Sequence, residues 1–153
     1  MSVGDMLSVI IDARGEAEGL PGLLAQLTAG AVDGLVRQVL IVAAADQPGI
    51  DHLCEDMGAE AHPTIEAAGA AARADQLLIL PADFRLRDGW IRSLGGHLTR
   101  GAEPAVVTGL AEGGLFGRRP FGVLVERGRL EGRRGADLQR LRRDLGLRAR
   151  RIG

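Results

Sequence analysis

The first hundred residues alternate between short apolar runs and longer segments whose apolar residues recur at helical spacing. Strands are expected at residues 6–11, 37–45, 59–62 and 76–81, and helices at 16–29, 48–57, 64–74 and 88–98. The runs at 37–45 and 76–81 are apolar almost throughout, which is typical of strands covered on both faces. Such alternation predicts an α/β fold, a mostly parallel sheet with helices on both faces.

Beyond residue 100 the pattern changes. Strands are expected at 104–109 and 121–126, a helix at 135–145 and a closing strand at 147–152. A chain of 153 residues is long enough to bury one core, and no repeat or clear linker divides it. Both parts are therefore predicted to belong to a single domain.

Composition is that of an ordinary globular protein, with 46% hydrophobic and 25% charged residues. No apolar run approaches the roughly 20 residues that a membrane helix needs, and no signal-peptide pattern opens the sequence. The cytoplasm is therefore the expected location. Cys54 is the only cysteine, which excludes a disulfide framework, and no Cys/His spacing indicates zinc.

The charges are segregated along the chain. Residues 1–117 contain 7 arginines and 16 acidic residues, whereas residues 118–153 contain 12 arginines and 4 acidic residues. A basic end of this kind suits nucleic acid, a membrane surface or phosphates, or is simply a solvated helix face. With 3% aromatic residues and no tyrosine there is little for bases to stack on, so nucleic acid is not an expected partner. The oligomeric state is not predicted.

A single carboxylate, Asp83, stands just past the apolar strand at 76–81. In open α/β sheets ligands bind outside the carboxyl ends of the strands. An aspartate there can hold a divalent cation that neutralises phosphate oxygens, or it can cap a turn. The first turn, 12–19, contains neither of the glycine-rich signatures of dinucleotide and P-loop sites.

Three segments together resemble family 2 glycosyltransferases of the GT-A fold. They read Ser-Val-Ile-Ile-x-Ala-Arg-x-Glu-Ala-x-Gly-Leu-Pro-x-Leu-Leu from residue 8, Val-x-x-Val-Leu-Ile-Val from residue 36, and Leu-Leu-Ile-Leu-x-Ala-Asp from residue 77. The resemblance covers residues 6–100. It continues more weakly over 121–151, where Gly-Ala-Asp-Leu-Gln-Arg-Leu-Arg-Arg at 135–143 is similar to the family's acceptor-side helix.

This resemblance implies a nucleotide-diphosphate-sugar site at the carboxyl edge of the sheet. Residues 1–100 would form the nucleotide-sugar-binding half of the domain, and residues 101–153 an abbreviated acceptor-side half. It further implies nucleotide-sugar contacts from Arg14, Glu16 and Arg73, a Mg²⁺ or Mn²⁺ ion on Asp83, and acceptor deprotonation by Asp137. Asp46, which follows the second strand, is assigned to the nucleotide sugar as a substitute for the aspartate that the family has at the end of that strand. Each of these residues also has a purely structural interpretation, as a helix-terminal, turn-forming or solvated side chain.

The sequence departs from the family pattern at two important places. Ala43 replaces the aspartate that contacts the nucleoside, and Pro81 replaces the first metal-motif side chain. An alanine methyl accepts no hydrogen bond, so restoring aspartate at Ala43 is predicted to strengthen binding.

These departures leave three functions open. The first is a glycosyltransferase-like protein, inverting if active. The alternative is a non-catalytic binding or scaffold protein on the GT-A fold. The third is a nucleotidyltransferase resembling the molybdenum-cofactor guanylyltransferases, suggested by Leu-Pro-Ala-Asp at 80–83, although 12–19 lacks that group's glycine-rich basic turn.

Overall fold

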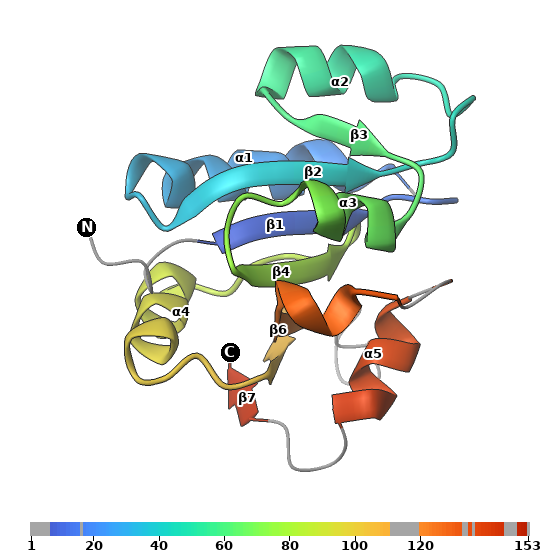
Figure 1. The fold of residues 1–153 in the computed structure, drawn as a ribbon. Helices are drawn as coiled ribbons and strands as arrows, with labels where there is room; N and C mark the ends of the chain where they lie inside the picture. The colour runs from blue at the N-terminus through green and yellow to red at the C-terminus, as the bar shows by residue number, and fades with distance from the viewer. Residues whose placement is uncertain are drawn as a thin grey trace.

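The computed structural model describes residues 7–15, 17–110, 120–132, 135, 137–145 and 150–152. Within these ranges one sheet contains seven strands in the order β3-β2-β1-β4-β6-β5-β7 (Figure 1). The strands are β1 (Leu7–Asp12), β2 (Val36–Val42), β3 (Glu60–His62), β4 (Gln76–Pro81), β5 (Ala105–Thr108), β6 (Phe121–Glu126) and β7 (Arg150–Ile152). The helices are α1 (Leu20–Val32), α2 (Ile50–Met57), α3 (Ile65–Ala71), α4 (Trp90–Thr99) and α5 (Leu138–Leu145), with a 3₁₀ helix at Arg127–Leu130.

The sheet is mostly parallel, as predicted. β1 pairs in parallel with β2 on one side and β4 on the other, and β3 continues in parallel beyond β2. β6 is antiparallel to both β4 and β5, and β7 is parallel to β5. The strands expected at 37–45 and 76–81 thus lie in the same sheet, which confirms the α/β fold class.

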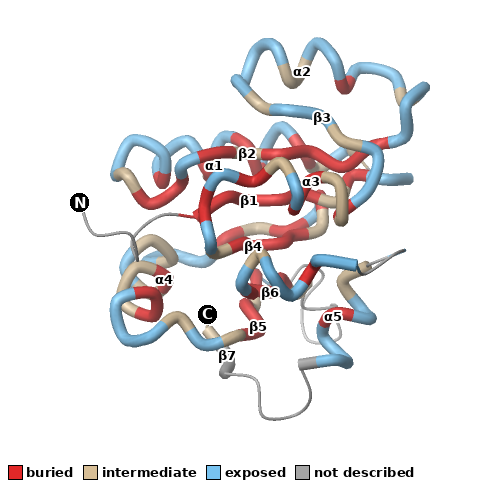
Figure 2. Tube along the Cα trace, viewed as in Figure 1, coloured by how far each residue is buried: buried red, intermediate tan, exposed pale blue. Residues whose placement is uncertain are grey.

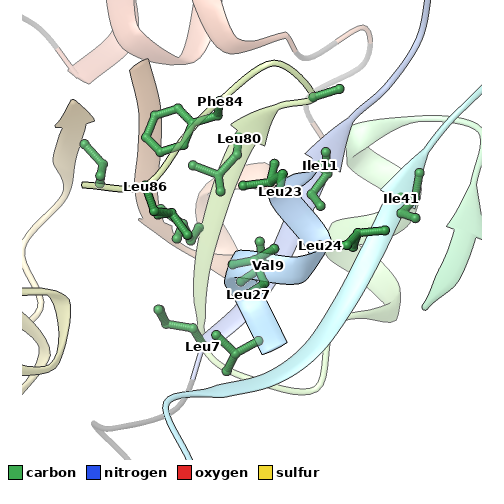
Figure 3. Packing of buried hydrophobic residues seen from close by; sticks show 14 of the residues in the cluster. Leu7, Val9, Ile11, Leu23, Leu24, Leu27, Ile41, Leu80, Phe84 and Leu86 are labelled. Carbon is green, nitrogen blue, oxygen red and sulfur yellow. The ribbon is translucent and has the colours of Figure 1, made fainter. Parts of the chain in front are cut away.

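Helices cover both faces of this sheet. Leucines of α1 pack with Val9 and Ile11 of β1 in one apolar cluster, to which α2 and α4 also contribute (Figure 3). Ile10 points to the opposite face, where it joins residues of α3, the 3₁₀ helix and α5 in a second cluster. Because successive strand residues face opposite ways, the apolar run in β1 serves both cores, and the central strands are the most buried part of the chain (Figure 2).

Local signals account for where several helices begin. The first turn of α1 contains Pro21. Proline lacks a backbone N–H, and this is no loss in the first turn because N–H groups there have no partner within the helix. Thr64 is the N-cap of α3, and its Oγ1 accepts a hydrogen bond from the Ala67 N–H at 3.0 Å. None of the helices in the described ranges combines the length and apolar character needed to span a bilayer.

One helix is shorter than predicted because the sheet competes for its backbone. α3 ends at Ala71 instead of residue 74. The N–H of Arg73 donates to Oε1 of Gln38 at 2.9 Å, and the N–H of Ala74 donates to Oγ of Ser8 at 3.1 Å. Ser8 and Gln38 are buried polar residues on adjacent strands, so these bonds satisfy groups that would otherwise be costly to bury.

Two helix-interior glycines provide a matched test of this packing. A Cβ on Gly30 of α1 would collide with the Trp90 ring and would lie 2.8 Å from Cγ2 of Val36, whereas a Cβ on Gly95 of α4 meets nothing. We expect Gly30→Ala to lower the free energy of unfolding by about 1–3 kcal/mol through overpacking. Gly95→Ala should raise it by about 0.5–1 kcal/mol, the usual gain of alanine over glycine in a helix. Urea denaturation measures both, and equal effects of the two substitutions would contradict this packing.

Candidate functional site

Three parallel strands end side by side at one edge of the sheet. Asp12, the last residue of β1, lies opposite Val42 of β2 and Pro81 of β4. The N–H of Ala13 donates to the Val42 carbonyl at 2.8 Å, and that of Ala82 donates to the Asp12 carbonyl at 3.2 Å. The segments following these strands therefore leave the sheet together, at the edge where open α/β sheets bind ligands.

Arg14 is paired with Asp12 in the turn that follows β1. Its Nε donates to Oδ1 of Asp12 at 2.9 Å and its Nη2 donates to Oδ2 at 3.0 Å, while the Arg14 backbone N–H reaches Oδ1 at 3.2 Å. Two parallel bonds fix the plane of the guanidinium. The hydrogen bond to Asp12 raises the pKa of Arg14, partial burial opposes this, and the charges of Asp12 and Asp137 raise it further.

Asp137 comes from the far end of the chain, and α5, which follows it, packs beside the start of β6, where β4 ends. Its charge is close enough to raise the pKa of Arg14. It precedes α5, and its Oδ1 accepts a hydrogen bond from the Arg140 N–H at 2.8 Å, the geometry of a helix N-cap. Nε of Arg140 lies 3.6 Å from Oδ2. The Asp137 side chain is 45% exposed, so an incoming ligand has access to its carboxylate.

Arg142 joins α5 to this edge, a contact that the sequence analysis missed. Its guanidinium lies 4.6 Å from the ring centroid of Phe121, the first residue of β6. Because β6 is antiparallel to β4, its start lies where β4 ends. This cation–π contact therefore holds α5 beside the loops that carry Arg14 and Asp83. Arg142 and Phe121 stand at no recognisable spacing in the sequence, so the sequence offered no signal for this contact beyond the presence of an aromatic residue among many arginines.

Asp83 lies in the loop after β4 and is exposed to solvent. The turn before α1 packs directly on this loop, since a Cβ on Gly19 would be 2.9 Å from the Ala82 carbonyl oxygen and 3.2 Å from Cα of Asp83. The first turn and the predicted metal motif are thus neighbours, on the same side of the sheet.

Arg85, which the sequence analysis did not select, fixes these two loops to each other. Its Nη2 would lie 2.8 Å from a Cβ on Gly22 and 3.3 Å from one on Gly19, so the guanidinium lies over both glycines. Its Nη1 donates to the Phe84 carbonyl at 2.7 Å, and its own carbonyl accepts from Leu110. The two glycines three residues apart at the start of α1 were the only sequence signal for this contact.

The loop after β2 holds Asp46 at the same edge, exposed to solvent. Gln47 anchors this loop by donating from Nε2 to the Ala13 carbonyl at 2.8 Å and by accepting from the Ala44 N–H at 3.2 Å. β2 ends at Val42, so Ala43 lies outside the strand that was predicted to include it. The Ala43 side chain nevertheless belongs to the core, with 6% exposure.

The structure brings four of the six predicted site residues to one edge: Arg14, Asp46, Asp83 and Asp137. Arg73 precedes β4 and therefore lies at the opposite edge, where its N–H contacts Gln38. Glu16 lies outside the described residues. The geometry thus gives Arg73 no support as part of the predicted site.

The residues at this edge fit a divalent cation poorly. Among the described residues, no group of three or more His, Cys, Asp or Glu side chains is placed to hold a metal ion. The Pro81 side chain has no ligand atom, and both carboxylate oxygens of Asp12 are bonded to Arg14. Mg²⁺ would have Asp83 plus whatever oxygens phosphates and water supplied.

The solved structures with a similar fold include two kinds of transferase. Mannosyl-3-phosphoglycerate synthase from Rubrobacter xylanophilus superposes with a TM-score of 0.54 and 22% identity over 69% of this chain and 40% of its own. Glucosyl-3-phosphoglycerate synthase from Mycobacterium tuberculosis, in complex with Mn²⁺, uridine diphosphate and phosphoglyceric acid, superposes with a TM-score of 0.53 and 20% identity. The superposition covers 72% of this chain and 45% of that enzyme. The chain thus spans less than half the length of these two enzymes.

A 4-diphosphocytidyl-2C-methyl-D-erythritol synthase superposes over more of both chains, with a TM-score of 0.61, 15% identity, and coverage of 96% of this chain and 87% of its own. No family model matches the sequence, and no curated protein does so either. At these identities the shared feature is the fold. The chain therefore has the GT-A-like α/β fold found in nucleotide-sugar transferases and nucleotidyltransferases.

The burial of Ala43 reverses the expectation that aspartate there would restore binding. Ala43→Asp would place a carboxylate in the apolar cluster beneath α1, and burying an unpaired polar group is costly. We expect it to lower the free energy of unfolding by roughly 1–3 kcal/mol. The control Ala44→Asp, at the exposed neighbouring position, should change it by less than about 0.5 kcal/mol. Chemical denaturation compares the two, and a stable Ala43→Asp protein with improved nucleotide-sugar affinity would contradict this.

Proposed function

We propose that this chain is a glycosyltransferase-like protein of the family 2 type, which binds a nucleoside-diphosphate sugar at the carboxyl edge of its sheet and transfers the sugar to an acceptor hydroxyl. The observation that carries the proposal is that the contact of Arg142 with Phe121 holds α5 beside the end of β4, so that Asp137, at the start of α5, lies close enough for its charge to raise the pKa of Arg14. Arg14 and Asp46 are assigned to the donor side, and Asp137 to the acceptor side.

Asp137 is the proposed general base. Its N-cap bond to the Arg140 N–H sets the direction of the carboxylate, and each carboxylate oxygen still has a lone pair for another hydrogen bond. In the proposed reaction the acceptor hydroxyl gives its proton to Asp137 as its oxygen attacks the anomeric carbon. The bond from that carbon to the diphosphate breaks on the opposite side, which inverts the anomeric configuration.

A nucleotidyltransferase is the second candidate. It is favoured by the superposition on 4-diphosphocytidyl-2C-methyl-D-erythritol synthase, which covers 96% of this chain and 87% of that enzyme. Such an enzyme would take a nucleoside triphosphate and release pyrophosphate, whereas a glycosyltransferase releases a nucleoside diphosphate. The released product therefore distinguishes the two candidates.

Transfer and binding respond differently if Asp137 is the base. Asn is as good an N-cap as Asp, so Asp137→Asn should leave both the fold and the binding of a nucleotide sugar intact. Loss of a general base should slow transfer by about 10²–10⁴-fold. The matched control is Asp33→Asn, an exposed aspartate that follows α1 at the opposite edge. Thermal shift with UDP-, GDP- and dTDP-sugars measures binding, and assay of the released nucleoside diphosphate measures transfer.

Each other outcome selects a different function. Binding without turnover by the unmodified chain would favour the non-catalytic binding protein. Pyrophosphate release from CTP or GTP would favour the nucleotidyltransferase. Transfer that survives Asp137→Asn would remove Asp137 from the chemistry.

A further inference from the structure

A diphosphate bound at this edge needs positive charge close to its oxygens, and the acidic residues present do not assemble a divalent-cation site. Asp12 is bonded to Arg14 through both oxygens, and Asp137 caps α5. Asp46 and Asp83 remain, on different loops, with Pro81 two residues before Asp83 in place of a side-chain ligand. Among the described residues no group of three or more such side chains could hold a metal ion.

Arg14 offers a fixed cation at the same place. The guanidinium has five N–H donors, and the pair with Asp12 uses two of them, Nε–H and one N–H of Nη2. Three donors remain outside this pair. The Arg14 side chain is 34% exposed, so a ligand at the edge has access to the guanidinium. Guanidinium groups bind phosphate oxygens through two parallel hydrogen bonds and remain charged at all physiological pH values.

Asp12 determines where this cation lies. It is the last residue of the most buried strand, held on one side by β2 and on the other by β4, and its side chain is 19% exposed. A flexible arginine held by two hydrogen bonds to such a residue has already lost much of its rotamer freedom, so less remains to be lost when a ligand binds.

We infer that Arg14, positioned by Asp12, neutralises the diphosphate of the bound nucleotide in place of a divalent cation, so that nucleotide binding needs no metal. This rests on the proposed function, because it concerns the same nucleotide site. In this arrangement Asp83 does not hold a metal ion and weakens nucleotide binding. Without a cation on it, an exposed carboxylate near the diphosphate repels the nucleotide.

The test is calorimetric titration with UDP, GDP, CDP and dTDP, each in EDTA and again with Mn²⁺. At least one nucleotide should bind equally well, within about threefold, in the two buffers. Arg14→Gln should weaken its binding in EDTA by about tenfold or more, the usual effect of losing a charge-assisted hydrogen bond. The control Arg92→Gln, an exposed arginine of α4 beside Gly34 at the opposite edge, should bind like the unmodified chain.

Asp83→Asn separates the two roles of that carboxylate. In EDTA it should tighten nucleotide binding by a few-fold, because a repelling charge is removed. Binding that appears only with Mn²⁺, is lost in Asp83→Asn and is unaffected by Arg14→Gln would overturn the inference while leaving the proposed function standing. Absence of binding by every nucleotide in both buffers would overturn the proposed function, and the inference with it.

Asp12→Asn tests the positioning role. It should weaken binding by a few-fold in the unmodified chain but have no further effect in Arg14→Gln, because a residue that acts through Arg14 has nothing to position once Arg14 is gone. An equal loss in both backgrounds would mean a merely structural role. Tighter binding by Asp12→Asn would show that Asp12 competes with phosphate for Arg14, and would overturn its positioning role. Thermal unfolding of each variant confirms that the fold is intact.

Discussion

The position of every loop at the candidate site depends on the pairing of β1 with a parallel strand on each side. Val9, Ile10 and Ile11 are fully buried, and their backbone bonds run to both β2 and β4. Because β1 is hydrogen-bonded in parallel register to β2 and to β4, the three strands end level with one another. The loops that contain Arg14, Asp46 and Asp83 emerge at one edge for this reason, and not because of any direct contact among these three residues.

The reversed strand β6 brings the last third of the chain to the same edge. Because β6 is antiparallel to β4, Phe121 lies where β4 ends, and Arg142 of α5 packs over its ring. Leu141 of α5 is buried in the second apolar cluster. With one face held by this core and the other by the cation–π contact, α5 places its N-cap Asp137 within electrostatic reach of Arg14.

The ion pairs at this edge matter for orientation more than for stability. Exposed and half-exposed pairs contribute about 0–1 kcal/mol to folding, because solvent screens them and side-chain entropy opposes them. The pair between Arg14 and Asp12 nevertheless fixes a guanidinium plane beside the loop of Asp83. Arg85, placed against Gly19 and Gly22, fixes the two loops themselves. A site built in this way has its cations in place before any ligand arrives.

Local sequence patterns were sufficient to predict the fold class and most elements of the first hundred residues. Periods of two and of about 3.6 residues report which side chains face a core, and they depend only on neighbours in the chain. The strands covered on both faces at β2 and β4 followed directly. Boundaries were less predictable. α3 ends early because Ser8 and Gln38, both distant in sequence, bond to the backbone beyond it.

The sequence by itself determined which residues carry charge, and it was enough to place Arg14 and Asp83 in loops that follow predicted strands. Only the tertiary structure decided how these charges pair. The bond between Arg14 and Asp12, the burial of Ala43 and the contact of Arg142 with Phe121 depend on side-chain direction and on strand order. Arg73 lies at the wrong edge for the same reason. A pattern along the chain specifies the order of the elements, but the edge of the sheet that a residue reaches is set by the direction in which its strand runs.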